Sequence, residues 1–242
     1  MGSLMGSFIK SDTNRSKMFS NKILNTFMIL ILGGVLGIFS KWLDEISLND
    51  DVWWHNILSF LDLGNVLSML GIWILIALCI SIYSATPLRA GINVFVFFLA
   101  MNINYHLYTI FFAGFNPMSY MMIWYGITLF SPILAFICWY SKGYGIIPII
   151  INIGIITVMI LCSFAIGMWY FDFISFIDTI IFIITLVVLY ETPKKSIIAL
   201  TGGFIVAFML RLFIWFLRNY LGVSVVWKVK KNALKSIFWW KV

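Results

Sequence analysis

Long apolar stretches separated by short polar connections constrain this chain more than any other feature of its sequence. Hydrophobic residues fill 62% of its 242 positions and charged residues only 10%, against about half and a quarter in soluble domains. A single soluble core could not bury so much apolar surface. Seven stretches approach or reach the roughly 20 residues that a helix needs to cross a bilayer: Ile23–Phe39, Leu61–Tyr83, Ala90–Ala113, Met118–Tyr140, Ile146–Met168, Phe173–Tyr190 and Ile197–Leu217. The sequence therefore predicts an all-α, polytopic transmembrane helix bundle of six to seven spans.

The distribution of charge predicts three regions and an orientation, because cytoplasmic connections are enriched in Lys and Arg. Residues 1–22 form a polar, basic tail that is expected in the cytoplasm, and residues 23–217 form the helix bundle. The acidic connection after the first span is expected outside, with Lys41 as its lone base. Later connections alternate in the same sense, with Arg89, Lys142, Lys194 and Lys195 inside.

The C-terminal region, residues 218–242, departs from this rule. Its basic residues would lie outside after a seventh span, so either the stretch 197–217 does not fully cross or this tail is an exception. Within the tail, Lys228, Lys231 and Lys235 recur at helical spacing beside apolar residues. This pattern is typical of an amphipathic helix on a membrane surface, and an ordinary basic tail is the alternative.

Polar side chains inside the apolar stretches mark the candidate site, because such residues are costly in lipid and usually face protein or water. The third stretch is the most polar, so we expect that helix at the centre of the bundle. One interpretation is a polar cavity open to the outside; the other is that these side chains only hold helices together. The residues predicted to line the cavity are Asn102, Tyr105, His106, Asp178 and Arg211.

Arg211 needs a partner if it is buried, because an unpaired charge in a low dielectric is unstable. Asp178, at a similar depth on the preceding helix, is the predicted partner in an ion pair. The alternative is that Arg211 extends to the membrane interface.

Glycine, proline and threonine predict local packing. Gly33-Gly34-x-x-Gly37 and Gly202-Gly203 favour close helix contact rather than a phosphate loop, since no strand precedes them and no Lys-Ser/Thr follows. Thr86-Pro87 and Thr192-Pro193 are typical of capped helix starts. Pro132 indicates either a kink or a helix broken near mid-membrane.

Several chemistries have no sequence support. There is no HExxH, and two histidines make a His-rich metal site unlikely, so no metal is expected. There is no GxSxG elbow, no nucleotide-binding loop and no nucleic-acid motif. No cofactor and no catalytic residue is predicted, and the three cysteines are interpreted as small packing residues.

Four parts of the chain suggest a relationship: Leu32–Lys41, Asp62–Asn65, Phe97–Pro117 with Asn104-Tyr105-His106 at its centre, and Trp124–Tyr140 with Ser131-Pro132. Together they resemble a family of uncharacterised small multi-pass membrane proteins of Gram-positive bacteria. The resemblance extends from the first helix to about Leu217. It implies a bacterial plasma-membrane location and no catalytic residues.

Three functional hypotheses follow from these observations. The first is a small transport or solute-binding component, which without a nucleotide site would need an ion gradient or an ATPase partner. The alternative is a non-catalytic accessory, immunity or assembly factor that acts by contact with another membrane protein. The third, a lipid-modifying enzyme, would depend on Asp44, Glu45, Asp62 and His106.

Overall fold

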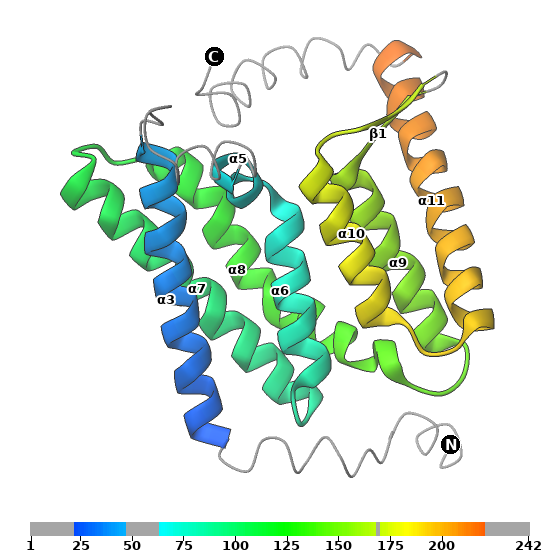
Figure 1. The fold of residues 1–242 in the computed structure, drawn as a ribbon, viewed down its shortest axis with the longest axis horizontal. Helices are drawn as coiled ribbons and strands as arrows, with labels where there is room; N and C mark the ends of the chain where they lie inside the picture. The colour runs from blue at the N-terminus through cyan, green and yellow to red at the C-terminus, as the bar shows by residue number, and fades with distance from the viewer. Residues whose placement is uncertain (1–21, 47–62, 168–169, 221–242) are drawn as a thin grey trace.

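The computed structural model describes residues 22–46, 63–167 and 170–220 as helices side by side, with one hairpin at an end (Figure 1). Consecutive long helices run in opposite directions, so their ends gather at two opposite ends of the molecule. We call these the Glu45 end and the Pro87 end. The helices are α3 (Lys22–Glu45), α5 (Leu63–Ser68), α6 (Leu70–Tyr83), α7 (Pro87–Phe112), α8 (Met118–Trp139), the 3-10 turn η1 (Tyr140–Lys142), α9 (Ile147–Ser163), α10 (Phe176–Leu189) and α11 (Pro193–Tyr220).

The long helices form two groups (Figure 1). In the first group α7 packs against α3, α6 and α8, and in the second group α9 packs against α10 and α11. Helix α6 belongs to the first group and also contacts α9 and α10, so it joins the two. Helix α7, the third apolar stretch, is central within the first group, where it packs against α3, α6 and α8, but α6 and not α7 joins the two groups, so the prediction that α7 lies at the centre of the whole bundle is confirmed only in part.

Four of the described helices are long and apolar enough to cross a membrane: α3, α7, α8 continued by η1, and α11. The other three long helices are apolar but shorter, with 14 residues in α6, 17 in α9 and 14 in α10. At 1.5 Å per residue a 14-residue helix spans about 21 Å, less than the roughly 30 Å of a hydrocarbon core. The described residues thus support a membrane protein with four candidate spans, fewer than the six to seven predicted.

A β-hairpin accounts for part of this difference and makes the all-α prediction incomplete. The stretch predicted to be helical to Met168 leaves the helix after Ser163, and β1 (Phe164–Ile166) pairs antiparallel with β2 (Phe171–Phe173). Phe164 packs on Phe171, Phe173 and Phe182, with ring centroids 5.1–5.5 Å apart. Aromatic residues favour strands, and this cluster offers them packing that a continued helix would not.

Close helix packing at the glycine clusters is confirmed. A Cβ atom at Gly33 or Gly37 of α3 would collide with the backbone carbonyl of Phe97 or Met101 in α7. In the second group, a Cβ at Gly203 of α11 would lie 2.6 Å from the Ile156 side chain of α9. Backbones can approach this closely only where side chains are absent, so the glycines set the spacing of both helix pairs.

Both Thr-Pro junctions cap helices as predicted. The Thr86 hydroxyl accepts a hydrogen bond from the Arg89 amide at 3.2 Å, at the start of α7. The Thr192 hydroxyl accepts from the Lys195 amide at 3.5 Å, at the start of α11. Helix α8 continues without interruption through Pro132, so the broken helix that this proline might have caused does not form.

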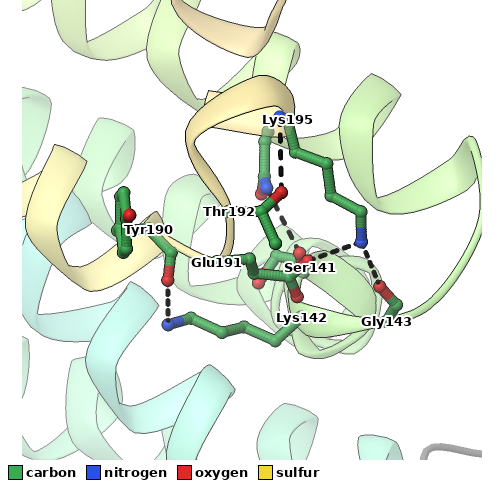
Figure 2. A network of polar contacts seen from close by, with 8 residues as sticks. Ser141, Lys142, Gly143, Tyr190, Glu191, Thr192 and Lys195 are labelled. Carbon is green, nitrogen blue, oxygen red and sulfur yellow. Dashed lines mark hydrogen bonds and ion pairs between the residues drawn. The ribbon is translucent and has the colours of Figure 1, made fainter. Parts of the chain in front are cut away.

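Two lysines join η1 to the junction between α10 and α11 at the Pro87 end (Figure 2). Lys142 donates a hydrogen bond to the backbone oxygen of Tyr190 at 3.1 Å. Lys195 donates in the opposite direction, to the backbone oxygen of Gly143 at 3.2 Å, and pairs with Glu191 at 2.7 Å. Each segment thus supplies a cation to a carbonyl oxygen of the other, which fixes α9 relative to α10 and α11 at this end.

Candidate binding pocket

The C-terminal turns of α3 bring charged residues to the Glu45 end. The first apolar stretch, Ile23–Phe39, is short and was expected to extend at one end; the helix continues to Glu45, so Lys41 is part of it and not of the external connection as predicted. Lys41 is buried and pairs with Glu45 one turn away, at 3.2 Å. An ion pair at positions i and i+4 stabilises a helix, which accounts for the longer element.

Asp44 connects this end of α3 to two other elements. Its carboxylate accepts a hydrogen bond from the Ser68 hydroxyl in α5 at 3.2 Å and one from the Tyr105 hydroxyl in α7 at 2.9 Å. The Lys41 ammonium lies 5.8 Å from the centroid of the Tyr105 ring and 5.2 Å from that of Phe115. These contacts hold Tyr105 in place beneath a charged layer.

Below this layer lies a small pocket formed by five helices. It offers about 20 Å³ to the centre of a water molecule, which is room for one or very few water-sized occupants. Polar and aromatic side chains make up most of its wall, and leucine and methionine side chains make up the rest. The lining residues are Ser40, Leu67, Trp73, Met101, Asn102, Tyr105, Tyr120, Met121 and Trp124.

Asn102 has a fixed orientation in this wall. Its amide nitrogen donates to the Trp124 backbone oxygen at 3.3 Å and to the Thr128 hydroxyl at 2.7 Å. That hydroxyl itself donates to the Trp124 oxygen at 2.9 Å, so it can only accept from Asn102. Both acceptors therefore require nitrogen on this side of the amide, and the side-chain oxygen of Asn102 remains available on the other.

The other polar groups of the lining residues are the hydroxyls of Ser40, Tyr105 and Tyr120 and the indole N–H groups of Trp73 and Trp124. Ser40 is buried, and its hydroxyl makes no hydrogen bond to another residue in the described ranges. The Tyr105 hydroxyl donates its proton to Asp44, which leaves its oxygen lone pairs as acceptors. Trp73 contributes its ring, because its indole N–H already donates to the Leu67 backbone oxygen at 2.8 Å.

His106 does not line the pocket, although it was predicted to line a cavity together with Asn102 and Tyr105. Its Nδ1 lies 2.9 Å from the Tyr125 hydroxyl and its Nε2 lies 2.9 Å from the side-chain oxygen of Asn116. The side chain is half-buried and directed to α8 and the turn before it. The structure therefore brings Asn102 and Tyr105 together, with His106 as a neighbour outside the cavity.

Asp178 and Arg211 belong to the second group, away from the pocket lining. Asp178 is buried in the first turn of α10, and its Oδ1 would lie 3.9 Å from a Cβ at Gly71 of α6. Asp178 and Arg211 both lie within electrostatic reach of Cys162 on α9, so they share one region near the Glu45 end. The ion pair between them stays a prediction.

Several residues of the pocket were missed by sequence reasoning. Trp73, Tyr120 and Trp124 occupy ordinary apolar stretches and Ser40 directly follows one, and in such places an aromatic ring or a small hydroxyl gives no signal of a cavity. The spacing of Lys41 and Glu45 was the one available sign that α3 continues past Phe39. In the described part of the chain, no group of three or more His, Cys, Asp or Glu side chains could hold a metal ion.

Comparison with known proteins gives no match, neither to a protein-family model, nor to a curated protein, nor to a solved structure.

Proposed function

We propose that this protein is a multi-pass protein of a bacterial plasma membrane, with the Pro87 end in the cytoplasm. The basic residues Arg89, Lys142, Lys194 and Lys195 gather at the Pro87 end, whereas Asp44, Glu45 and Asp172 lie at the other. This asymmetry is the one expected from the enrichment of cytoplasmic connections in Lys and Arg. The three shorter helices cross as well in this arrangement, with α5 extending α6 and the hairpin completing α9 and α10, which gives seven crossings.

The proposed molecular function is binding or transport of a very small solute. One observation carries it: a buried asparagine, held by two hydrogen bonds, leaves its side-chain oxygen available in a pocket near the outer side. Preorganised polar groups in a mostly apolar cavity are typical of ligand sites. The room available limits the occupant to roughly the size of water.

Transport in this scheme depends on a gradient or on a partner. The sequence has no nucleotide-binding loop, so an ATPase partner would have to supply any hydrolysis. A water-sized solute that moves down its own concentration gradient needs no coupled ion gradient and no ATPase. The permeability measurement below addresses this case.

The test is solute permeability in proteoliposomes that contain the purified full chain. Stopped-flow light scattering would follow vesicle shrinkage in hyperosmotic sucrose, which reports water permeability, and volume recovery in hyperosmotic ammonium chloride, which reports entry of a water-sized ion. We expect a faster volume change than in empty vesicles for at least one of these two. Asn102→Leu should abolish this gain, since it removes the polar oxygen and keeps a similar side-chain volume.

His106→Ala is the matched control, because His106 lies on the same helix outside the pocket. It should retain most of the permeability. Wild-type vesicles whose volume changes no faster than that of empty ones in both media would contradict transport, and equal losses in the two variants would remove the pocket from the proposal.

An accessory factor that contacts another membrane protein is the second candidate. The small size of the pocket and the close approach of α3 to α7 at Gly33 and Gly37 favour it, since both describe a tightly packed bundle. Cross-linking in intact cells, followed by identification of a defined membrane partner, would test it. An accessory factor predicts that Asn102→Leu leaves the cross-links unchanged. The solute-binding proposal predicts an effect of this variant on permeability and none in particular on the cross-links.

A further inference from the structure

We infer that the solute accepted by this pocket is water, and that the pocket passes water while it excludes ions; this inference deepens the proposed solute-binding function and rests on it. Three properties of the cavity carry it: its size, the balance of donors and acceptors in its wall, and the neutrality of its lining residues.

The size of the cavity limits the occupant to a single small molecule. The cavity offers about 20 Å³ to the centre of a water molecule, which exceeds the roughly 10–15 Å³ that one buried water needs. It is too small for an ion together with its hydration shell. A buried water also needs about two to four polar partners, so the pocket fits one water if its wall supplies them.

The wall supplies two acceptors. The amide nitrogen of Asn102 already donates to Trp124 and Thr128, so its side-chain oxygen is the atom left to accept a bond. The Tyr105 hydroxyl donates its proton to Asp44 at 2.9 Å, so its oxygen can only accept further bonds. A water molecule in the cavity can donate one proton to each of these two oxygens.

The wall supplies two donors as well. The Ser40 hydroxyl is buried and bonds to none of the described residues, so its proton is available. The Tyr120 hydroxyl accepts a hydrogen bond from the indole N–H of Trp124, which leaves its own proton available. Water donates two hydrogen bonds and accepts two, and so matches all four groups. Ammonium has no lone pair for the two protons, and a halide has no proton for the two oxygens.

The residues that line the pocket are all neutral. The nearby charges of α3 are of both signs and are bonded in the layer above, Lys41 to Glu45 and Asp44 to Tyr105. An ion that enters a small cavity loses its hydration shell, at a far higher cost than a neutral molecule when no opposite charge replaces the shell. Attraction of a cation to the aromatic rings of the wall is small beside that cost. The lining therefore favours a neutral occupant.

Stopped-flow light scattering of proteoliposomes that contain the purified full chain tests the inference. Shrinkage in hyperosmotic sucrose reports water, and volume recovery in hyperosmotic ammonium chloride reports an ion of about the same size. We expect faster shrinkage than in empty vesicles, and recovery in ammonium chloride no faster than in empty vesicles. Ser40→Ala should lower the protein-dependent water permeability by about fivefold, the usual effect of one lost neutral hydrogen bond.

Matched variants keep the result interpretable. Ser81→Ala is the control for Ser40→Ala, because Ser81 is a buried helical serine outside the pocket, and it should leave the permeability unchanged. Tyr120→Phe keeps the ring and removes a donor, so it should also lower water permeability. Tyr83→Phe, an exposed tyrosine at the Pro87 end, is its control and should have no effect. If Ser40→Ala does not fold, the tyrosine pair decides the question alone.

Shrinkage of wild-type vesicles no faster than that of empty ones, faster recovery in ammonium chloride, or equal effects of the pocket variants and their controls would overturn the inference. Faster recovery in ammonium chloride would leave the proposed solute-binding function intact, since a small solute still passes. Rates equal to those of empty vesicles in both media would remove the two together.

Discussion

The two helix groups use polar residues in different ways. In the first group, side chains of different helices bond to one another: Thr26 of α3 donates to the Asn93 side chain of α7 at 2.8 Å, and Asn102 donates to Thr128 of α8 at 2.7 Å. In the second group, threonine hydroxyls mostly return to their own helix, as Thr185 does to the Ile181 backbone oxygen at 2.9 Å. The first group is therefore specified by bonds between side chains. In the second group the bonds between helices run from a side chain to a backbone oxygen, as from Thr157 to Gly203 at 3.3 Å and from Ser163 to Asp178 at 3.0 Å, around an apolar core.

A binding site can form where side chains of different helices bond to one another. A side chain that bonds across helices fixes the geometry of both and can leave a second polar atom in a defined place, as Asn102 does. A threonine hydroxyl that donates to a backbone oxygen of its own helix makes its hydrogen bond without fixing the position of a neighbouring helix. The pocket accordingly lies in the first group.

The largest effect should come from the close contact of α3 with α7. Gly37→Leu places a side chain against the Met101 carbonyl, so α3 must move away from α7. We expect a loss of about 3 kcal/mol in unfolding free energy, at the upper end for overpacking. Unfolding by sodium dodecyl sulfate in mixed micelles, followed by circular dichroism, would measure it.

Gly154→Leu in α9 is the control for that change, because a Cβ at Gly154 meets no atom within 4 Å. It should be neutral or slightly stabilising, since leucine is a better helix former than glycine. A Gly37 variant as stable as the Gly154 variant would show that the first group is not held by this close approach.

An intermediate effect is expected from Asn102→Leu, which removes the hydrogen bonds to Trp124 and Thr128. Hydrogen bonds between membrane helices contribute about 0.6–2 kcal/mol, so we expect a loss of about 1–2 kcal/mol by the same unfolding measurement. Thr185→Val, which removes a bond within α10 only, should cost less than about 0.5 kcal/mol. Similar losses of unfolding free energy for Asn102→Leu and Thr185→Val would contradict the proposed difference in polar bonding between the two helix groups.

The smallest effect should come from Lys195→Met at the Pro87 end of the second group (Figure 2). The lysine side chain is 28% exposed, and partly exposed ion pairs contribute at most about 1 kcal/mol, less at high salt. We expect faster hydrogen exchange at residues 143–147, since Gly143 loses its bond to this lysine. Lys194→Met, an exposed neighbour, is the control and should leave the exchange rates unchanged.

Much of the fold could be predicted from local sequence signals. The glycine clusters of α3 and α11, the Thr-Pro caps and the position of α7 at the centre of the first group all follow from rules that involve one helix or one turn. The ends of elements were less predictable. The break at Met69 before α6 and the hairpin after Ser163 replace helix where the apolar pattern alone continues.

The candidate site was predictable only in part. Asn102 and Tyr105 were identified because polar residues in an apolar helix are few. His106 lies next to Tyr105 in sequence yet turns to Tyr125 and Asn116, because one helical residue changes direction by about 100°. The pairing of Asp178 with Arg211 stays a prediction, and residues 221–242 of the predicted basic tail, 218–242, lie outside the described residues.

The sequence by itself determined the solvent of this protein, the existence of its seven long helices and the polarity of its two ends, since each depends on composition or on spacing along one segment. Only the tertiary structure decided the pocket. Ser40, Trp73, Asn102 and Trp124 come from four different helices, and of these only Asn102 differs in sequence from an ordinary packing residue. Their convergence depends on the distance between helix axes, which the glycines of α3 set and which no single segment encodes.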